Sequence, residues 1–258
     1  MNLSDPLCFT LIVLLLAHLL GDFVLQPGSW VRRKEIRSWK SGTFYAHILL
    51  HGLLAWVLIA KCAFWPWAIV LMISHGLVDL LKIYAQKKAR SAKRRWFWID
   101  QLLHLLCLLL IGMGWVGQTN GGFVEVAKTS WEAVSALWTL QHISLLTALV
   151  FLTWPSAICI RTLIAGWTPS YNNTLETDSL HNAGKYIGML ERLFVFAFVL
   201  TGHLEGVGFL LAAKSIFRFG DLKAARDRKL TEYVLIGTLL SFGFALLAGT
   251  LFLKFEIG

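Results

Sequence analysis

The sequence predicts an all-α protein, a polytopic transmembrane helical bundle with about eight spans, with seven as the alternative count. Composition is the first reason, because 57% of the 258 residues are hydrophobic and the mean hydropathy is +0.63. Soluble domains average about 45–50% apolar residues. The second reason is that several apolar runs approach the ~20 residues that a membrane-spanning helix needs. Most of the chain is therefore expected to lie in a lipid bilayer.

The apolar runs divide the chain into three parts. Residues 1–118 are expected to form a four-helix bundle that carries a metal site, residues 119–140 an external interfacial segment, and residues 141–258 a C-terminal helical half of the same membrane domain. Two runs in the last part are short, so they predict either two short helices or a re-entrant hairpin. The expected spans cover residues 6–26, 43–61, 68–86, 96–115, 141–164 with a kink at Pro155, 186–201, 206–219 and 231–252.

The net charge of +9 comes from basic residues that cluster between apolar runs, mainly in residues 32–40 and 87–95. Two spans separate these clusters, so both are expected on the same side of the membrane. The positive-inside rule places that side in the cytoplasm and the N-terminus outside. The same rule explains the excess of basic residues, so we do not expect nucleic acid as a partner.

Four consecutive apolar runs each contain one pair of potential metal ligands at positions i and i+4. Residues with this spacing lie on the same face of a helix. Because chain direction alternates while the order of the pairs also alternates, all eight groups are expected near the cytoplasmic ends of their helices. Ionisable groups inside a membrane usually have a function. The pairs are His18 with Asp22, His47 with His51, His75 with Asp79, and Asp100 with His104.

Imidazole and carboxylate together suit a divalent transition metal, with zinc expected and iron or manganese as alternatives. The eight groups could hold one ion or two, and a metal-bound water would be the nucleophile. Asp22, Asp79 and Asp100 are the candidate bases. Three polar neighbours are expected to orient the ligands: Gln26, Ser74 and Gln101. A structural polar network and a proton or ion pathway are the alternatives.

A second charged cluster lies in the C-terminal half. Arg192, Lys214 and Arg218, with Glu191 beside them, could bind an anionic lipid headgroup. The alternative is a set of ion pairs, such as Glu191 with Arg218, that holds the short helices together.

Several stretches resemble a bacterial family of multi-pass membrane proteins of unknown function. They include HLLGDFVLQ at 18–26, HGLVDLLK at 75–82, DQLLH at 100–104, GKYIGMLER at 184–192, AAKSIFRF at 212–219 and EYVLIGTLLSF at 232–242. The resemblance covers nearly the whole chain and implies a location in the bacterial inner membrane, with no established activity. The paired ligands are also similar, more loosely, to those of membrane-bound metal-dependent hydrolases.

These observations lead to one preferred hypothesis and two alternatives. The preferred function is an intramembrane metal-dependent hydrolase that acts on a lipid or lipid-linked substrate at the cytoplasmic leaflet. The alternatives are a metal-ion or proton transporter and a membrane di-iron redox protein. The substrate and the oligomeric state cannot be read from the sequence.

Overall fold

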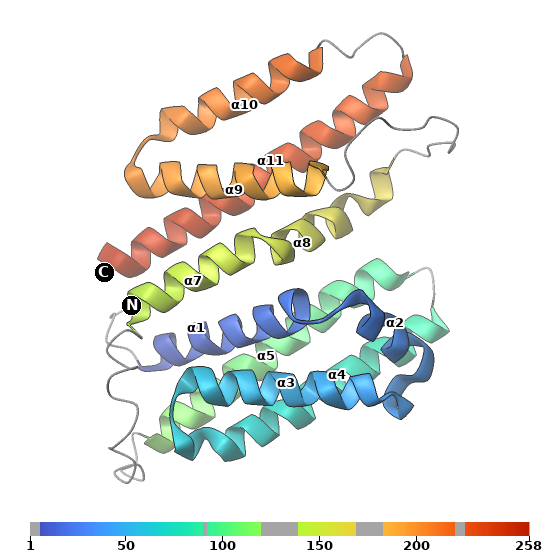
Figure 1. Ribbon diagram of the computed structural model, residues 1–258, viewed down its shortest axis with the longest axis vertical. Helices are drawn as coiled ribbons and strands as arrows, with labels where there is room; N and C mark the ends of the chain where they lie inside the picture. The colour runs from blue at the N-terminus through green and yellow to red at the C-terminus, as the bar shows by residue number, and fades with distance from the viewer. Residues whose placement is uncertain (1–5, 90–91, 120–138, 169–182, 220–224, 258) are drawn as a thin grey trace. The chain divides into compact units, whose positions relative to one another are not determined.

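The computed structural model describes residues 6–89, 92–119, 139–168, 183–219 and 225–257, and within these ranges every regular element is a helix (Figure 1). The all-α class is confirmed for this part of the chain. Five helices are long and apolar enough to cross a membrane, or up to six if one bent pair counts as a span. A membrane protein is therefore indicated. The expected count of about eight spans is not confirmed, because the helices of residues 183–201 and 204–219 are not among the candidates.

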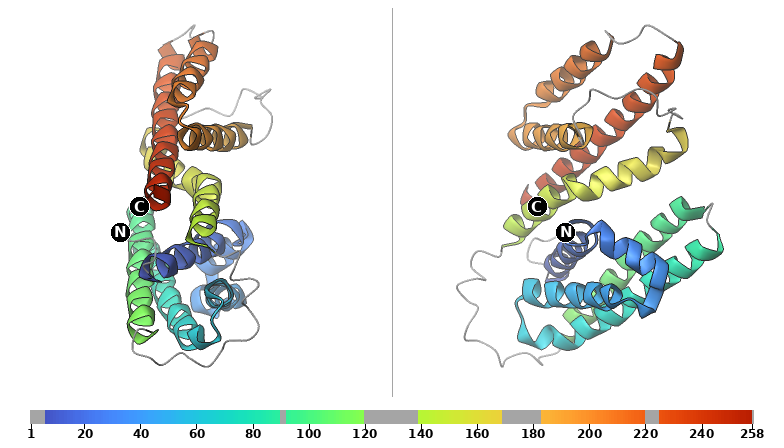
Figure 2. Two further views of the ribbon diagram at one scale, coloured as in Figure 1. Left: turned by 90° about the vertical axis from the view of Figure 1, so that its left-hand side faces the viewer. Right: turned by 45° about the vertical axis from the view of Figure 1, so that its right-hand side comes forward.

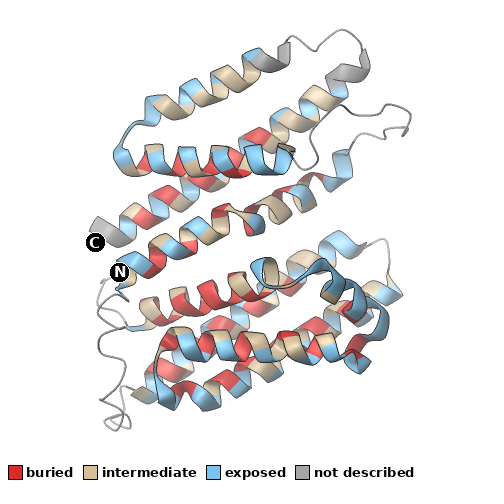
Figure 3. Cartoon of the chain, viewed as in Figure 1, coloured by how far each residue is buried: buried red, intermediate tan, exposed pale blue. Residues whose placement is uncertain are grey.

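Backbone contacts divide the chain into two compact units between Thr147 and Ala148. The first unit is built from four long helices in which α1 packs against α3 and α5, and α4 packs against the same two helices. These helices run side by side in Figure 1 and lie next to one another in both views of Figure 2, and their buried residues follow the faces turned towards one another (Figure 3). Their bounds are α1 Pro6–Leu19, which continues as the π-helix η1 Leu20–Val24, α3 Gly42–Ile59, α4 Trp65–Lys88 and α5 Lys93–Thr119.

The basic stretch after the first span is a helix, α2 Gly28–Arg37, rather than a loop. Arginine, lysine and glutamate favour helices almost as well as leucine does. One of its basic side chains, Lys34, is buried, while the Arg32, Arg33 and Arg37 side chains are exposed. Two short 3₁₀ turns, η2 Ser38–Lys40 and η3 Cys62–Phe64, connect the neighbouring helices.

The second unit contains the break that Pro155 predicted. Proline lacks a backbone N–H and clashes with the preceding helical turn, and the chain bends by 42° between α7 and α8. The two shorter runs form separate helices joined near Gly202, whose φ of 75° is readily adopted by glycine. The boundary between the units divides α7 Leu140–Leu152, and the second unit continues with α8 Trp154–Ile164, η5 Ala165–Trp167, α9 Ala183–Thr201, α10 Leu204–Phe219 and α11 Ala225–Ile257. Most of the expected external interfacial segment at 119–140 lies outside the described residues.

Candidate metal centre

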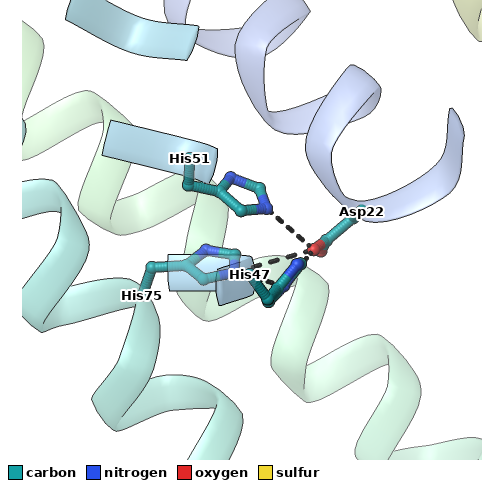
Figure 4. Close-up of side chains that lie close together, drawn as sticks. All are labelled: Asp22, His47, His51 and His75. Atoms are coloured by element: carbon teal, nitrogen blue, oxygen red, sulfur yellow. Dashed lines mark hydrogen bonds and ion pairs between the residues drawn. The ribbon is translucent and has the colours of Figure 1, made fainter. Parts of the chain in front are cut away.

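Four of the predicted ligands, from η1, α3 and α4, converge inside the first unit (Figure 4). The Nε2 atoms of His47 and His51 each lie 3.1 Å from Oδ1 of Asp22. The Nε2 atom of His75 lies 3.6 Å from the same oxygen and 3.0 Å from Nε2 of His47. One donor atom from each residue lies within 4.8 Å of the other three. We call this group the primary site.

The spacing of these four atoms suits a small divalent cation. Zinc–nitrogen bonds are about 2.0–2.1 Å long, so the ligand atoms of a tetrahedral zinc site lie about 3.3 Å apart. The distances between donor atoms given above, which run from 3.0 to 3.6 Å, bracket that value. The three histidine side chains are at most 2% exposed, whereas the Asp22 side chain is 10% exposed. Among the four ligands, Asp22 is therefore the one with the largest exposed fraction.

A π-helical turn brings Asp22 to the histidines of α3. In this turn the backbone N–H of Leu25 bonds the carbonyl of Leu20, five residues earlier. The wider turn changes the direction of the side chains relative to a regular α-helix, and such turns are frequent at functional sites. Asp22 is consequently closer to His47 and His51 than to His18, whose Nε2 lies 3.8 Å from Oδ2 of Asp22.

Gly21 makes room for the ring of His51. A Cβ atom at Gly21 would lie less than 3.0 Å from three atoms of that ring. The ring therefore packs against the backbone of η1, in a space that any other residue would fill. The role of Gly21 was not predicted from the sequence, although a glycine directly before a candidate ligand inside an apolar helix is a recognisable signal of close packing.

Two lysines also belong to the centre and were missed. Nζ of Lys34 lies 2.6 Å from Oδ2 of Asp79, and Nζ of Lys82 lies 2.7 Å from Oδ2 of Asp100. Two of the three predicted carboxylate ligands thus have an ammonium partner within the chain. The basic cluster that contains Lys34 had been explained by membrane topology alone, and only the folding of α2 reveals its contact with Asp79.

The remaining predicted ligands, His18, Asp79, Asp100 and His104, lie beside the primary site. Ring centroids are 4.2 Å apart for His75 and His104 and 5.1 Å apart for His18 and His104. His75, Asp79 and His104 form a second group whose donor atoms lie within 4.8 Å of one another. All eight predicted side chains therefore share one region of the bundle, but they do not form a single set of equivalent ligands.

Two of the three predicted supporting residues contact this region. Nε2 of Gln26 lies 2.9 Å from Nδ1 of His47. Because amide nitrogen and oxygen can exchange places, the Gln26 oxygen could accept Nδ1–H and leave Nε2 of His47 for a metal. Gln101 bridges His18 and Asp100. The hydroxyl of Ser74 instead donates to the carbonyl of Leu71 on its own helix.

The C-terminal cluster has internal partners in the second unit. Arg192 is 3% exposed, and its guanidinium donates to the carbonyls of Leu152 and Thr153, at 2.6 and 3.1 Å, and to Ser241 Oγ at 3.2 Å. These carbonyls lie at the break between α7 and α8, where the last turn of a helix lacks backbone partners. The geometry thus gives Arg192 a structural contact.

A second pair in this cluster is formed by Lys214 and Glu191. Nζ of Lys214 lies 2.5 Å from Oε2 of Glu191, with the two side chains 26% and 13% exposed. Glu191 had been considered as a partner of Arg218, whose side chain lies outside the described residues.

Comparisons with known proteins relate the first unit to one family. Residues 10–131 match the family model described as Protein of unknown function (DUF3307). The matched segment contains all eight predicted ligands and both lysines, and it stops before the motifs that begin at Gly184. Comparisons with curated proteins and with solved structures gave no match. The family match therefore covers the candidate metal centre and carries no activity.

Proposed function

We propose that this chain is a membrane-embedded, divalent-metal-dependent hydrolase whose ion is held by Asp22, His47, His51 and His75. The observation that carries the proposal is the convergence of three imidazole nitrogens on one carboxylate oxygen at distances of 3.1–3.6 Å. Zinc is the expected ion, because three neutral imidazoles and one carboxylate match its preferred ligands. When bound, the ion would supply Lewis acidity and lower the pKa of a coordinated water towards ~7.

The charges around the centre favour hydrolysis with a single resident ion. Three carboxylates face two ammonium groups, so the described side chains carry one negative charge when the imidazoles are neutral. One divalent ion leaves one positive charge, which a hydroxide would neutralise. Two divalent ions would leave a large buried positive charge, which is costly in a low-dielectric region.

A lipid or lipid-linked substrate fits the position of the primary site. Asp22 lies two residues before the end of η1, and His47 lies five residues after the start of α3. At 1.5 Å per residue, Asp22 and His47 lie about 3–8 Å from these helix ends, whereas His51, nine residues after the start of α3, lies about 14 Å from it. With the basic residues of α2 in the cytoplasm, the Asp22 edge of the site would lie near the headgroups of the cytoplasmic leaflet of a bacterial inner membrane. We propose eight spans and an external N-terminus for this arrangement.

Metal analysis is the first test. Purified full-length protein should contain about one zinc, manganese or iron ion per chain, whereas His51→Ala and Asp22→Asn should lose it. Folded wild-type protein that takes up no ion from any of the three metals would leave a hydrogen-bonded polar network as the explanation of the cluster.

Hydrolysis can then be tested without knowing the substrate. Protein reconstituted in vesicles of bacterial polar lipids is incubated in ¹⁸O-labelled water, and every hydrolysed bond leaves ¹⁸O in one product that mass spectrometry detects. The metal-loaded wild type should label a lipid product and Asp22→Asn should not. Equal labelling in both would refute the proposed reaction.

The shared position of His75 favours one second candidate, a metal-ion transporter. His75 belongs both to the primary site and to the group that contains Asp79 and His104, so the candidate ligands form a continuous row. Zinc flux into proteoliposomes that Asp22→Asn abolishes, without any ¹⁸O-labelled product, would favour transport over hydrolysis.

A further inference from the structure

The hydrogen bonds beside the primary site fix the orientation of the Gln101 amide. Nζ of Lys82 lies 2.7 Å from Oδ2 of Asp100, so this carboxylate is charged and can only accept hydrogen bonds. The Gln101 group 3.1 Å from the same oxygen must therefore be its NH₂. The Gln101 oxygen then faces Nε2 of His18 at 3.4 Å and accepts its proton. A neutral His18 consequently has its bare lone pair on Nδ1.

His104 is fixed in a similar way by its own helix. Its Nδ1 lies 2.9 Å from the backbone carbonyl oxygen of Asp100, which cannot donate. Nδ1 therefore carries the proton, and the lone pair of a neutral His104 is on Nε2. Metal-bound histidines commonly show this arrangement, with one nitrogen donating to a carbonyl and the other bound to the ion.

Within the described part of the chain, three buried side-chain atoms near α1 and α5 have no hydrogen-bond partner: His18 Nδ1, His104 Nε2 and Asp100 Oδ1. By the assignments above, all three are acceptors. Unpaired buried acceptors are costly, and a cation or a donor would satisfy them. Among the three, only His104 belongs to a group of potential ligands with closely spaced donor atoms, together with His75 and Asp79.

We propose that Asp79 and His104 form a second divalent-cation subsite, adjacent to the primary site and sharing His75 with it. Lys34 of α2 now partly fills this subsite, since it holds Oδ2 of Asp79 at 2.6 Å. The proposal rests on the metal centre of the proposed function and is independent of the reaction catalysed there.

Two features make the second subsite weaker than the primary one. A neutral His75 has a single lone pair, so two ions compete for it. The ammonium of Lys34 repels a second cation and occupies one oxygen of a ligand. Removal of Lys34 should therefore strengthen binding of the second ion on the order of tenfold or more, given the size of interactions between charges a few ångströms apart in a protein.

The experiment measures zinc bound per chain while the concentration of free zinc is set by chelator buffers, with full-length protein in nanodiscs. Wild type is expected to bind one ion at low free zinc and a second in a separate, weaker step. Lys34→Met should move the second step to at least about tenfold lower free zinc. His104→Gln should remove the second step and keep the first.

Lys82→Met is the matched comparison, because Lys82 pairs with Asp100 in the same manner and acts on Asp79 through its charge alone. It should move the second step clearly less than Lys34→Met does, because Lys34 also occupies an oxygen of a proposed ligand. A second step unmoved by Lys34→Met, or one that persists in His104→Gln, overturns the proposal. So does the absence of a second step in every variant.

The outcomes also separate this proposal from the proposed function. If the first step is lost in His51→Ala and no variant shows a second step, the primary site stands and the second subsite fails. If no variant binds zinc at all, both fail. Should Lys34→Met not fold, as judged by gel filtration, His104→Gln and Asp79→Asn decide the question, because each should abolish only the second step.

Discussion

Replacement of Gly21 by alanine should weaken the metal centre without touching any ligand. The added Cβ would lie less than 3.0 Å from three atoms of the His51 imidazole, whereas ordinary contacts with a Cβ are 3.4–4 Å. The ring must therefore move by several tenths of an ångström or more, and its Nε2 loses its place 3.1 Å from Asp22 Oδ1.

The expected loss of metal affinity follows from the proposed role of the His51 ring as a ligand. Disturbance of the groups that orient a ligand typically costs about 10–100-fold in metal affinity, which corresponds to about 1.4–2.7 kcal/mol. In the absence of metal, Gly21→Ala has two opposing effects on the free energy of unfolding. Alanine favours the helix over glycine by about 1 kcal/mol, while the crowding costs about 1–3 kcal/mol. The net cost to the metal-free protein is therefore about 0–2 kcal/mol, so the effect of added zinc, and not the stability without metal, is the quantity to compare.

Thermal unfolding with and without zinc measures this difference directly. An ion present at 100 times its Kd stabilises the folded state by about 2.7 kcal/mol, so wild-type protein should show a clear rise in Tm on zinc addition. Gly21→Ala should lose about half of that rise or more, because 10–100-fold weaker binding reduces the stabilisation to about 0.4–1.4 kcal/mol. Gly28→Ala is the control, since a Cβ there meets nothing within 4 Å, and it should keep the rise. A full zinc-dependent rise in Gly21→Ala would refute the placement of His51 at the ion.

Three further changes test other parts of the structure. Arg192→Met should lower stability by about 1–3 kcal/mol or somewhat more, because the buried carbonyl of Leu152 and the half-buried carbonyl of Thr153 lose their donor, with zinc content unchanged; normal stability combined with lost binding to anionic lipid vesicles would instead favour the headgroup interpretation. Gln26→Met should weaken zinc binding about 10–100-fold because Nδ1 of His47 loses its partner, as equilibrium dialysis would measure; an unchanged affinity would remove Gln26 from the centre. Asp100→Asn should keep the tightly bound ion, because Asp100 pairs with Lys82; loss of that ion in metal analysis would place Asp100 among the primary ligands.

The fold was predictable where apolar runs and helix-breaking residues dominate the sequence. The long runs mark α1, α3, α4 and α5, and Pro155 marks the break between α7 and α8. Helix α2 was not predicted, because a low hydropathy is equally compatible with a charged helix and with a charged loop. Local propensity allows the helix, but its contact with the centre, through Lys34 buried against Asp79, is not encoded in any local pattern.

The composition of the centre was predictable, but the division of roles within it was not. Spacing at i and i+4 identifies which residues share a helix face and leaves open which residues from different helices meet. The π-turn at Leu20–Val24 moves Asp22 towards α3, and the distinction between Asp22 and the other two aspartates arises from lysines on α2 and α4. Such pairings depend on how the helices pack, so they require a structure.

Helix α2 connects the topology of the chain with the chemistry of its centre. Its exposed arginines suit the cytoplasmic membrane face, as the positive-inside rule requires, while Lys34 on the same helix turns inward to Asp79. The C-terminal end of α2 and the turn after it are also held by α4, since Nζ of Lys87 on α4 lies 3.3 Å from the carbonyl of Ile36 and 2.6 Å from Ser38 Oγ. A basic cluster explained by topology can therefore contribute a charge to a buried site. A buried carboxylate needs a positive partner. If the proposed second subsite binds an ion, Lys34 and that ion would be alternative partners for Asp79, and the position of α2 would then influence how many ions bind.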